Sequence, residues 1–286
     1  MTNDDAAIGW KVRSVLHPTD LSVASEHAFA HALRIALAGK TRLYVLHVEP
    51  KDTEPVDWSA FPSVRRMLAA WGALEEDAAP SEVAERLGIH LVKAQVHNRD
   101  TVQAILQFLA RHPSDLVVLS THGREGMPRW LQGSVAEPVA RQANAETLFI
   151  PVGARGFIDP DSGKVRLRQV LIPVDQSPRP ESAVEAAWQL CGLLGAGEAI
   201  LHLLYVGEPG DMPAVEVPRA AAGQIRRTSK VGAAVDTILA VANELDVDMI
   251  AMATAGRQGF LDAIRGSTTE RVLRHAPCPV LAVPAA

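Results

Sequence analysis

Two stretches, Thr121–Glu137 (THGREGMPRWLQGSVAE) and Thr254–Glu270 (TAGRQGFLDAIRGSTTE), share one pattern and lie 133 residues apart. Each has a Gly, nine further residues, a Gly-Ser pair, and a Glu three residues after the Ser. Each also follows a short apolar run, which is typical of a buried strand. A repeat of this length matches a whole domain rather than a solenoid unit. The chain is therefore predicted to contain two copies of one α/β domain.

The beginnings of the two copies match as well. Lys11–Asp20 (KVRSVLHPTD) corresponds to Leu167–Asp175 (LRQVLIPVD), an apolar strand that ends in a Pro-containing turn and an Asp. The Asp residues are 155 positions apart, so the second copy is 22 residues shorter than the first. The difference falls between Val48 and Ile89. We expect the extra residues, around Trp58 to Leu87, to form a longer loop and an added helix.

Composition narrows the class of protein. The 286 residues suffice for two domains of ordinary size, and the net charge of −5 argues against a nucleic-acid-binding face. Cys191 and Cys278 lie in neither a metal-type nor a CxxC spacing, which favours packing roles. The N-terminus lacks the features of a signal peptide, and no apolar run is long enough to span a bilayer. A cytoplasmic protein is expected.

Short apolar runs alternate with amphipathic stretches in both copies, which predicts βαβ units and a mostly parallel sheet. The predicted strands are 12–17, 42–48, 89–96, 116–120 and 147–152, then 169–174, 199–206, 225–231, 249–253 and 279–283. The predicted helices include 25–38, 101–111, 181–194 and 233–245. The stretch 153–166 is interpreted as a linker, so the domains are expected at 10–154 and 166–286.

The matched positions suggest an anion site. In a doubly wound sheet, ligands bind beyond the carboxyl ends of strands where the strand order reverses. Asp20 and Asp175 lie at such ends. Ser134 with Glu137, and Ser267 with Glu270, have the spacing of capping boxes, and the free N–H groups of a helix start favour phosphate. Glycines that would let the loop approach an anion are Gly123, Gly126, Gly133, Gly256, Gly259 and Gly266, with Arg124, Arg129, Arg257 and Arg265 nearby.

Less specific interpretations remain open. The same residues could be helix caps and turn glycines without a ligand. His27 and His31 are four residues apart on a predicted helix, but no third ligand is evident, so packing is favoured over metal binding. No GxxxxGK[ST] loop is present, which argues against a Walker-type nucleotidase. Asp20 is the single candidate for a general base, and ribose or metal contact explains it equally well. No catalytic residue is therefore assigned.

These residues resemble the universal stress protein family, and nearly the whole chain is similar to its tandem form. The family signature is Gly, two residues, Gly, nine residues, then Gly-Ser or Gly-Thr after the fourth strand. The resemblance implies five-stranded parallel sheets of order 3-2-1-4-5 that hold ATP with Mg²⁺ in nucleotide-binding members. The implied contacts in the first copy are Pro18, Thr19, Asp20, Val48, Leu119, Ser120, Gly123, Gly133, Ser134 and Val135. In the second copy they are Val174, Asp175, Val206, Met252, Ala253, Gly256, Gly266, Ser267 and Thr268.

Both copies depart from the signature at its first Gly, which is Ser120 in one and Ala253 in the other. The second copy also has Val174 where the first has Thr19, and Ala255 where it has His122.

The resemblance implies a stress-response protein that binds ATP as a nucleotide-dependent sensor, with at most slow hydrolysis. The alternative is an interaction module of the same fold that binds no nucleotide. Single-domain members pair through the last strand, so strands 147–152 and 279–283 are expected to pair internally. A homodimer of whole chains is a further possibility.

Overall fold

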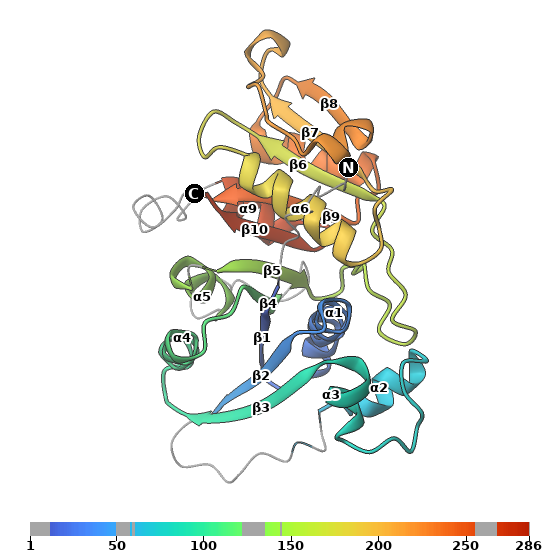
Figure 1. Ribbon diagram of the computed structural model, residues 1–286. Coiled ribbons are helices and arrows are strands. Elements are labelled where there is room, and N and C mark those ends of the chain that lie inside the picture. Colours follow the sequence, from blue (N-terminus) through green and yellow to red (C-terminus); the bar gives the residue numbers. More distant parts are fainter. Residues whose placement is uncertain are drawn as a thin grey trace, which may run out of the picture.

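The computed structural model describes residues 12–49, 58, 61–121, 135–143, 145–254 and 268–285. Its strands form one ten-stranded sheet that runs through the molecule from end to end (Figure 1). The strands are β1 (Ser14–Thr19), β2 (Arg42–Glu49), β3 (His90–His97), β4 (Leu116–Thr121), β5 (Glu146–Pro151), β6 (Gln169–Val174), β7 (Ile200–Val206), β8 (Ile225–Lys230), β9 (Met249–Thr254) and β10 (Val280–Pro284).

Helices connect the strands. They are α1 (Val23–Gly39), α2 (Val64–Ala70), α3 (Glu82–Leu87), α4 (Thr101–Arg111), α5 (Ala136–Gln142), α6 (Glu181–Leu193), α7 (Ala234–Glu244) and α9 (Thr268–His275), with 3₁₀ turns η2 (Pro209–Asp211) and η3 (Arg219–Gln224). The insertion in the first copy thus forms two short helices, α2 and α3, where the sequence predicted one. Predicted helices and strands otherwise agree with the structure to within a few residues.

The sheet order is β3-β2-β1-β4-β5-β10-β9-β6-β7-β8. Each half therefore has the predicted parallel order 3-2-1-4-5, and the two halves meet where β5 pairs with β10. That pairing is antiparallel and joins Phe149 to Val280, Leu148 to Leu281 and Thr147 to Ala282. The expected internal pairing through the last strands is confirmed. Because the junction is antiparallel, the carboxyl ends of the strands point in opposite directions in the two halves.

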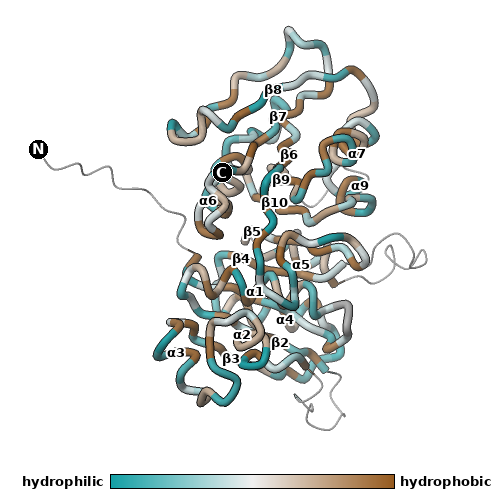
Figure 2. Tube along the Cα trace, turned by 90° about the vertical axis from the view of Figure 1, so that its right-hand side faces the viewer, coloured by the Kyte–Doolittle hydropathy of each residue, from teal (hydrophilic) through white to brown (hydrophobic). Residues whose placement is uncertain are grey.

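Helices cover both faces of the sheet, as the edge-on view in Figure 2 shows. One face packs against α1, α2, α3 and α6, and the other against α4, α5, α7 and α9. Alternate strand residues separate into the two cores: Val15 lies in the first core and Leu16 in the second. The strands read as continuous apolar runs because a parallel sheet is buried on both faces.

Strand β1 extends to Thr19, so Pro18 lies within the strand rather than in a turn. The prediction of a Pro-containing turn was wrong for both copies, since Pro173 also lies within β6. The register explains why. Strand β1 pairs with β4 only at Val15 and Leu16, so it has already separated from β4 before Pro18. A residue without an N–H is tolerated where one side of the ladder has ended.

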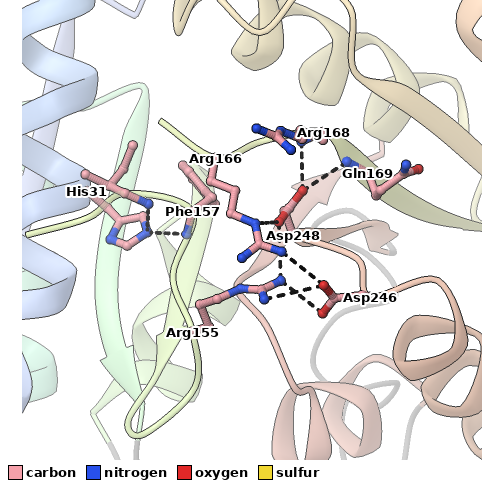
Figure 3. Close-up of polar contacts among 9 residues, drawn as sticks. His31, Arg155, Phe157, Arg166, Arg168, Gln169, Asp246 and Asp248 are labelled. Carbon is pink, nitrogen blue, oxygen red and sulfur yellow. Dashed lines mark hydrogen bonds and ion pairs between the residues drawn. The ribbon is translucent and has the colours of Figure 1, made fainter. Parts of the chain in front are cut away.

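The segment 153–166 is a folded connector rather than a loose linker. Ile158 and Val165 form an isolated antiparallel bridge, and Phe157 is fully buried. Helix α1 anchors the connector through His31, whose Nε2 accepts hydrogen bonds from the N–H groups of Phe157 at 3.1 Å and Ile158 at 3.2 Å (Figure 3). Two apolar residues within a Gly-, Pro- and Asp-rich stretch were the sequence signal for this packing.

The same connector is tied to the second half by ion pairs. Arg155 and Arg166 each lie within 3.0 Å of an oxygen of Asp246, and both also approach Asp248 (Figure 3). Asp248 is buried, and its Oδ2 accepts from the backbone N–H groups of Arg168 at 2.7 Å and Gln169 at 3.0 Å. The connector therefore bridges α1 of the first half and the start of β9 in the second.

Candidate nucleotide site

The candidate site lies at the carboxyl edge of the first half, where β1 and β4 separate. The two strands are paired at Val15–Leu116 and Leu16–Val117, and their described pairing ends there. Strand β2 runs alongside β1 as far as His47, and β4 continues to Thr121. Strand order reverses between β1 and β4, which is the position where doubly wound sheets bind ligands.

A tight turn follows β1 and leads into α1. Asp20 is exposed, and its Oδ1 accepts hydrogen bonds from the N–H of Ser22 at 3.0 Å and from its hydroxyl at 2.6 Å. Leu21 has a positive φ of 63°, an uncommon conformation for a residue with a branched side chain. One oxygen of Asp20 is thus committed to the turn, and the other is available to a ligand hydroxyl or a cation.

A buried chain of hydrogen bonds holds this turn against β4. His17 Nδ1 lies 3.0 Å from the carbonyl oxygen of Val118, so Nδ1 carries the proton and Nε2 is the acceptor. The Ser25 hydroxyl is 3.5 Å from that Nε2 and 2.8 Å from the Thr19 hydroxyl, which in turn accepts from the N–H of Leu21. Each donor in this series of hydrogen bonds points from the turn toward β4, so a single assignment of the protons satisfies every bond in it.

Burial sets the charge of this histidine. His17 is fully buried beside Phe29, and desolvation lowers its pKa to about 4, against the smaller opposing effects of the Val118 carbonyl and Asp20. The ring is therefore neutral near pH 7, and its two hydrogen bonds hold the turn in a fixed position against β4. Sequence reasoning missed His17 and Ser25. A His in an apolar strand, two residues before a Thr-Asp pair, was the available signal.

A second histidine braces the same turn from β2. His47 Nδ1 donates to the carbonyl oxygen of Thr19 at 2.8 Å, and its Nε2 lies 3.3 Å from Glu49 Oε1. The carbonyl that would otherwise face the site is thus satisfied by the neighbouring strand. The ends of β1, β2 and β4 are fixed relative to one another by side chains of the first half.

The second half lacks this bracing. The positions of His17, Thr19 and Ser25 are taken by Ile172, Val174 and Pro180, and Val174 is buried in the core. Strands β6 and β9 separate after the same two pairs, at Val170–Met249 and Leu171–Ile250. The backbone crevice is therefore repeated, while the polar chain that supports it is present in the first half alone.

A cavity of about 760 Å³ adjoins Asp175 in the second half, between the start of α6 and residues 210–216. Asp175 Oδ1 accepts from the N–H of Gln176 at 2.7 Å. Two buried oxygens, Glu181 Oε2 and Ser182 Oγ, have no hydrogen-bond partner among the described residues. Among the described residues, four carboxylates and one cation line the cavity: Asp175, Glu181, Asp211 and Glu216, with Arg179. Such a surface repels a polyphosphate.

The predicted contact residues fall into three groups. Those at the carboxyl ends of the strands are Pro18, Thr19, Asp20, Val48, Leu119 and Ser120, and Val174, Asp175, Val206, Met252 and Ala253. Leu119 and Met252 direct their side chains into the core, so only their backbone could meet a ligand. Val135 and Thr268 lie at the starts of α5 and α9. Gly123, Gly133, Ser134, Gly256, Gly266 and Ser267 lie outside the described residues, as does His122.

The predicted helices after both Gly-Ser pairs are present. The residue that caps α5 is Val135, whose side chain makes no capping hydrogen bond, so the helix starts one residue later than a Ser134 cap predicts. Helix α9 begins at Thr268 with Glu270 in its first turn. The free N–H groups at these helix starts face the carboxyl edge of each half, because α5 and α9 each precede the last strand.

Metal binding by His27 and His31 finds no support. His31 is buried with both nitrogens hydrogen-bonded, Nδ1 to the His27 carbonyl and Nε2 to the connector. The described residues hold no cluster of three potential metal ligands. Both cysteines are buried and free. Among the described helices, none has the length and apolar character of a membrane span.

Comparison with known proteins identifies one family in two segments of the chain. The model of the universal stress protein family matches residues 11–151 and 216–284. A universal stress protein of Mycobacterium tuberculosis is 22% identical over 301 residues, covering 95% of this chain and 97% of its own length. One from Methanocaldococcus jannaschii is 29% identical over 141 residues, covering 48% and 81%. The crystal structure of a universal stress protein from Archaeoglobus fulgidus has the same fold, with a TM-score of 0.64, 21% identity and coverage of 97% and 100%.

Proposed function

Because this chain belongs to the universal stress protein family, as a tandem member, we propose that it binds ATP with Mg²⁺ in its first half. The bound nucleotide serves as a signal of cellular state in the stress response. The observation that carries the proposal is the braced opening between β1 and β4, with an exposed carboxylate at its rim. That opening lies at the strand-order reversal of a doubly wound sheet.

The first-half site divides into two parts of different chemistry. The free oxygen of Asp20 suits a ribose hydroxyl or a phosphate-bound cation, since one of its oxygens is held by Ser22. Val48, at the end of β2, offers an apolar contact for a flat base. The phosphates would lie toward the start of α5, where free N–H groups and the helix dipole favour anions. Gly133 and Ser134 are the proposed residues of this cradle.

The second half is a weaker nucleotide site. Its acidic cavity beside Asp175 opposes the triphosphate, and its strand ends lack the hydrogen-bond chain that positions the turn in the first half. Two halves of the same backbone topology therefore differ in the charge and polarity of their strand ends. We propose one high-affinity site per chain.

The site is proposed to hold nucleotide rather than to turn it over rapidly. His17 is no general base, because both its nitrogens are already in hydrogen bonds and its pKa is lowered to about 4 by burial. Asp20 is partly committed to the turn. In a sensor, the fraction of protein with bound nucleotide follows the cellular nucleotide concentration. This needs reversible binding, and it needs no water activated for hydrolysis.

The test is to denature the purified protein and quantify released nucleotide, then titrate nucleotide-free protein with ATP and Mg²⁺ by calorimetry. One nucleotide per chain is expected. Gly133→Val with Ser134→Ala should abolish binding with little effect on folding, because a Cβ branch fills the space a phosphate needs. The matched control is Gly266→Val with Ser267→Ala in the second half, which should leave affinity unchanged. Equal affinity in the first-half variant would rule out the phosphate cradle.

The second candidate function is an interaction module of the same fold without nucleotide. Ser120 and Ala253 favour it, since each replaces the first Gly of the signature and adds a Cβ beside the crevice. An empty protein that also fails to bind added ATP and Mg²⁺ would select this alternative. Ser120→Gly should then create binding, and it should leave affinity nearly unchanged if the wild type already binds.

A further inference from the structure

The inserted segment of the first half lines an open cavity that is separate from the nucleotide site. Its volume is about 830 Å³, within the range of small-molecule sites. Its lining residues come mostly from α2, α3 and the outer strand β3. These elements lie at the end of the molecule away from the second half (Figure 1). None of its lining residues belongs to the proposed nucleotide contacts. The 22 additional residues occur in the first copy alone.

Its charge is the reverse of that of the whole chain. The described residues of the lining include no Asp or Glu, although the chain carries a net charge of −5. Arg65, Arg66 and Lys93 line it, and none of the three has an ion-pair partner within the described part of the chain. Arg42 also touches the cavity, but its guanidinium donates to the Tyr44 hydroxyl at 3.4 Å, and Tyr44 lies in the core on the opposite face of the sheet. Cations gathered without acids form an anion-attracting surface.

One wall of the cavity is aromatic. Lys93 Nζ lies 5.2 Å from the ring centre of Trp58 and 5.9 Å from that of Phe61. Phe61 is buried and packs edge-on against Phe29 of α1 at 4.6 Å, so the wall is anchored in the core. Trp58 packs against Phe61 at 6.2 Å. A cation held over two rings can meet an anionic group while the rings contact a flat apolar body.

We propose that this cavity binds a small aromatic anion: a flat ring system that carries a carboxylate or phosphate. The rings of Trp58 and Phe61 contact the ring system, and Lys93 with Arg66 meets the anionic group. Arg65 is partly engaged, since its guanidinium donates to the Ala78 carbonyl at 2.9 Å, and it fixes the loop before α3. The ligand binds by non-covalent contacts alone, so no chemical step is involved.

The experiment is calorimetric titration of the full-length protein with 2-naphthoate, 2-naphthyl phosphate and the neutral 2-naphthylmethanol, each with and without saturating ATP and Mg²⁺. We expect at least one anion to bind, at least about tenfold more tightly than the neutral compound, with affinity that falls as salt is raised. ATP should not compete. Absence of binding by both anions, equal affinity for the neutral compound, or competition by ATP would each overturn the proposal.

Variants locate the binding to this cavity. Lys93→Met with Arg66→Gln removes two charges and keeps side-chain length, and should weaken anion binding at least about tenfold. Ala84→Phe, on α3, places a large side chain against the cavity and should weaken binding of all three compounds. Arg111→Gln is the matched control, an exposed cation on α4 outside the cavity, and should bind like the wild type. Unchanged binding in either of the first two variants refutes the assignment.

Discussion

His31 is a single buried side chain on which the connector between the two halves depends. Its Nε2 accepts from two backbone N–H groups of the connector, at 3.1 and 3.2 Å, and its Nδ1 donates to the His27 carbonyl at 2.7 Å. The ring also packs edge-on against Phe157 at 4.6 Å. Replacing it tests whether the connector is a folded element that contributes to stability.

His31→Leu places an apolar side chain at this position and removes Nε2, the acceptor of both hydrogen bonds. Phe157 and Ile158 then retain two buried N–H groups without partners. Each such group costs about 1–3 kcal/mol, so the free energy of unfolding should fall by about 2–6 kcal/mol. His31→Gln offers an amide oxygen at a similar distance along the side chain, and should recover about half of that loss.

Stability should also depend on pH through this residue. Burial lowers the pKa of His31 to about 4, mainly by desolvation, while the unfolded chain titrates near 6.5. A base with a lowered folded pKa contributes stability that is fully present above pH 6.5 and is lost as pH falls toward 4. Between pH 7.5 and pH 5 the loss is about 2 kcal/mol for His31, and about the same for His17. Each His31 variant should therefore show a decrease about 2 kcal/mol smaller than that of the wild type.

The assay is urea denaturation at both pH values, followed by far-ultraviolet circular dichroism. His27→Gln is the control, because His27 lies one turn earlier on α1 and is exposed. It should change stability by less than about 0.5 kcal/mol. If His31→Leu were as stable as this control at pH 7.5, or kept the full pH dependence of the wild type, the assigned hydrogen bonds would be wrong.

Two further predictions concern the matched residues Asp115, which is exposed, and Asp248, which is buried, and the two buried cysteines. Asp115 and Asp248 are matched residues whose Oδ2 accepts two backbone N–H groups before β1 and β6, but only Asp248 also meets Arg155 and Arg166. Asp248→Ala should lower the unfolding free energy by about 3–5 kcal/mol and Asp115→Ala by about 1–3 kcal/mol, and equal urea midpoints would contradict this. Burial raises the pKa of Cys191 and Cys278 to about 12, so neither thiol should react with a disulfide reagent at pH 8 until urea unfolds the protein. Prompt reaction of the native protein would show that one of them is accessible.

Much of the fold could be predicted because the chain contains its elements twice. The matched strand-end Asp residues and Gly-Ser pairs fixed the repeat, and apolar runs located every strand to within two residues. The connector and Pro18 could not be predicted in this way. Phe157 is buried because His31, 126 residues earlier, satisfies its N–H group, and Pro18 lies in a strand because β4 has already diverged. Local composition contains neither contact.

The site was only partly predictable for a related reason. Asp20 could be placed by the repeat and Thr19 by the family resemblance, whereas His17, Ser25 and His47 act through contacts that the repeat does not share. Their counterparts in the second half, Ile172, Pro180 and Tyr205, are different in chemistry. These three positions differ between the two copies, so the matched positions of the repeat do not include them. The differences between the copies mark the residues that hold the first-half turn in place.

The differences between the halves point to a division of roles within one backbone plan. The first half has the polar bracing at its strand ends and the basic cavity of the insertion, whereas the second has an acidic cavity beside Asp175. Because β5 and β10 pair antiparallel, the two strand-end edges face opposite directions, so a ligand at one does not touch the other. Coupling between them would have to pass through the shared sheet or through the connector, which contacts α1 on one side and Asp248 on the other. His31→Leu should therefore loosen the connection between the halves while leaving the hydrogen bonds of the Asp20 turn intact.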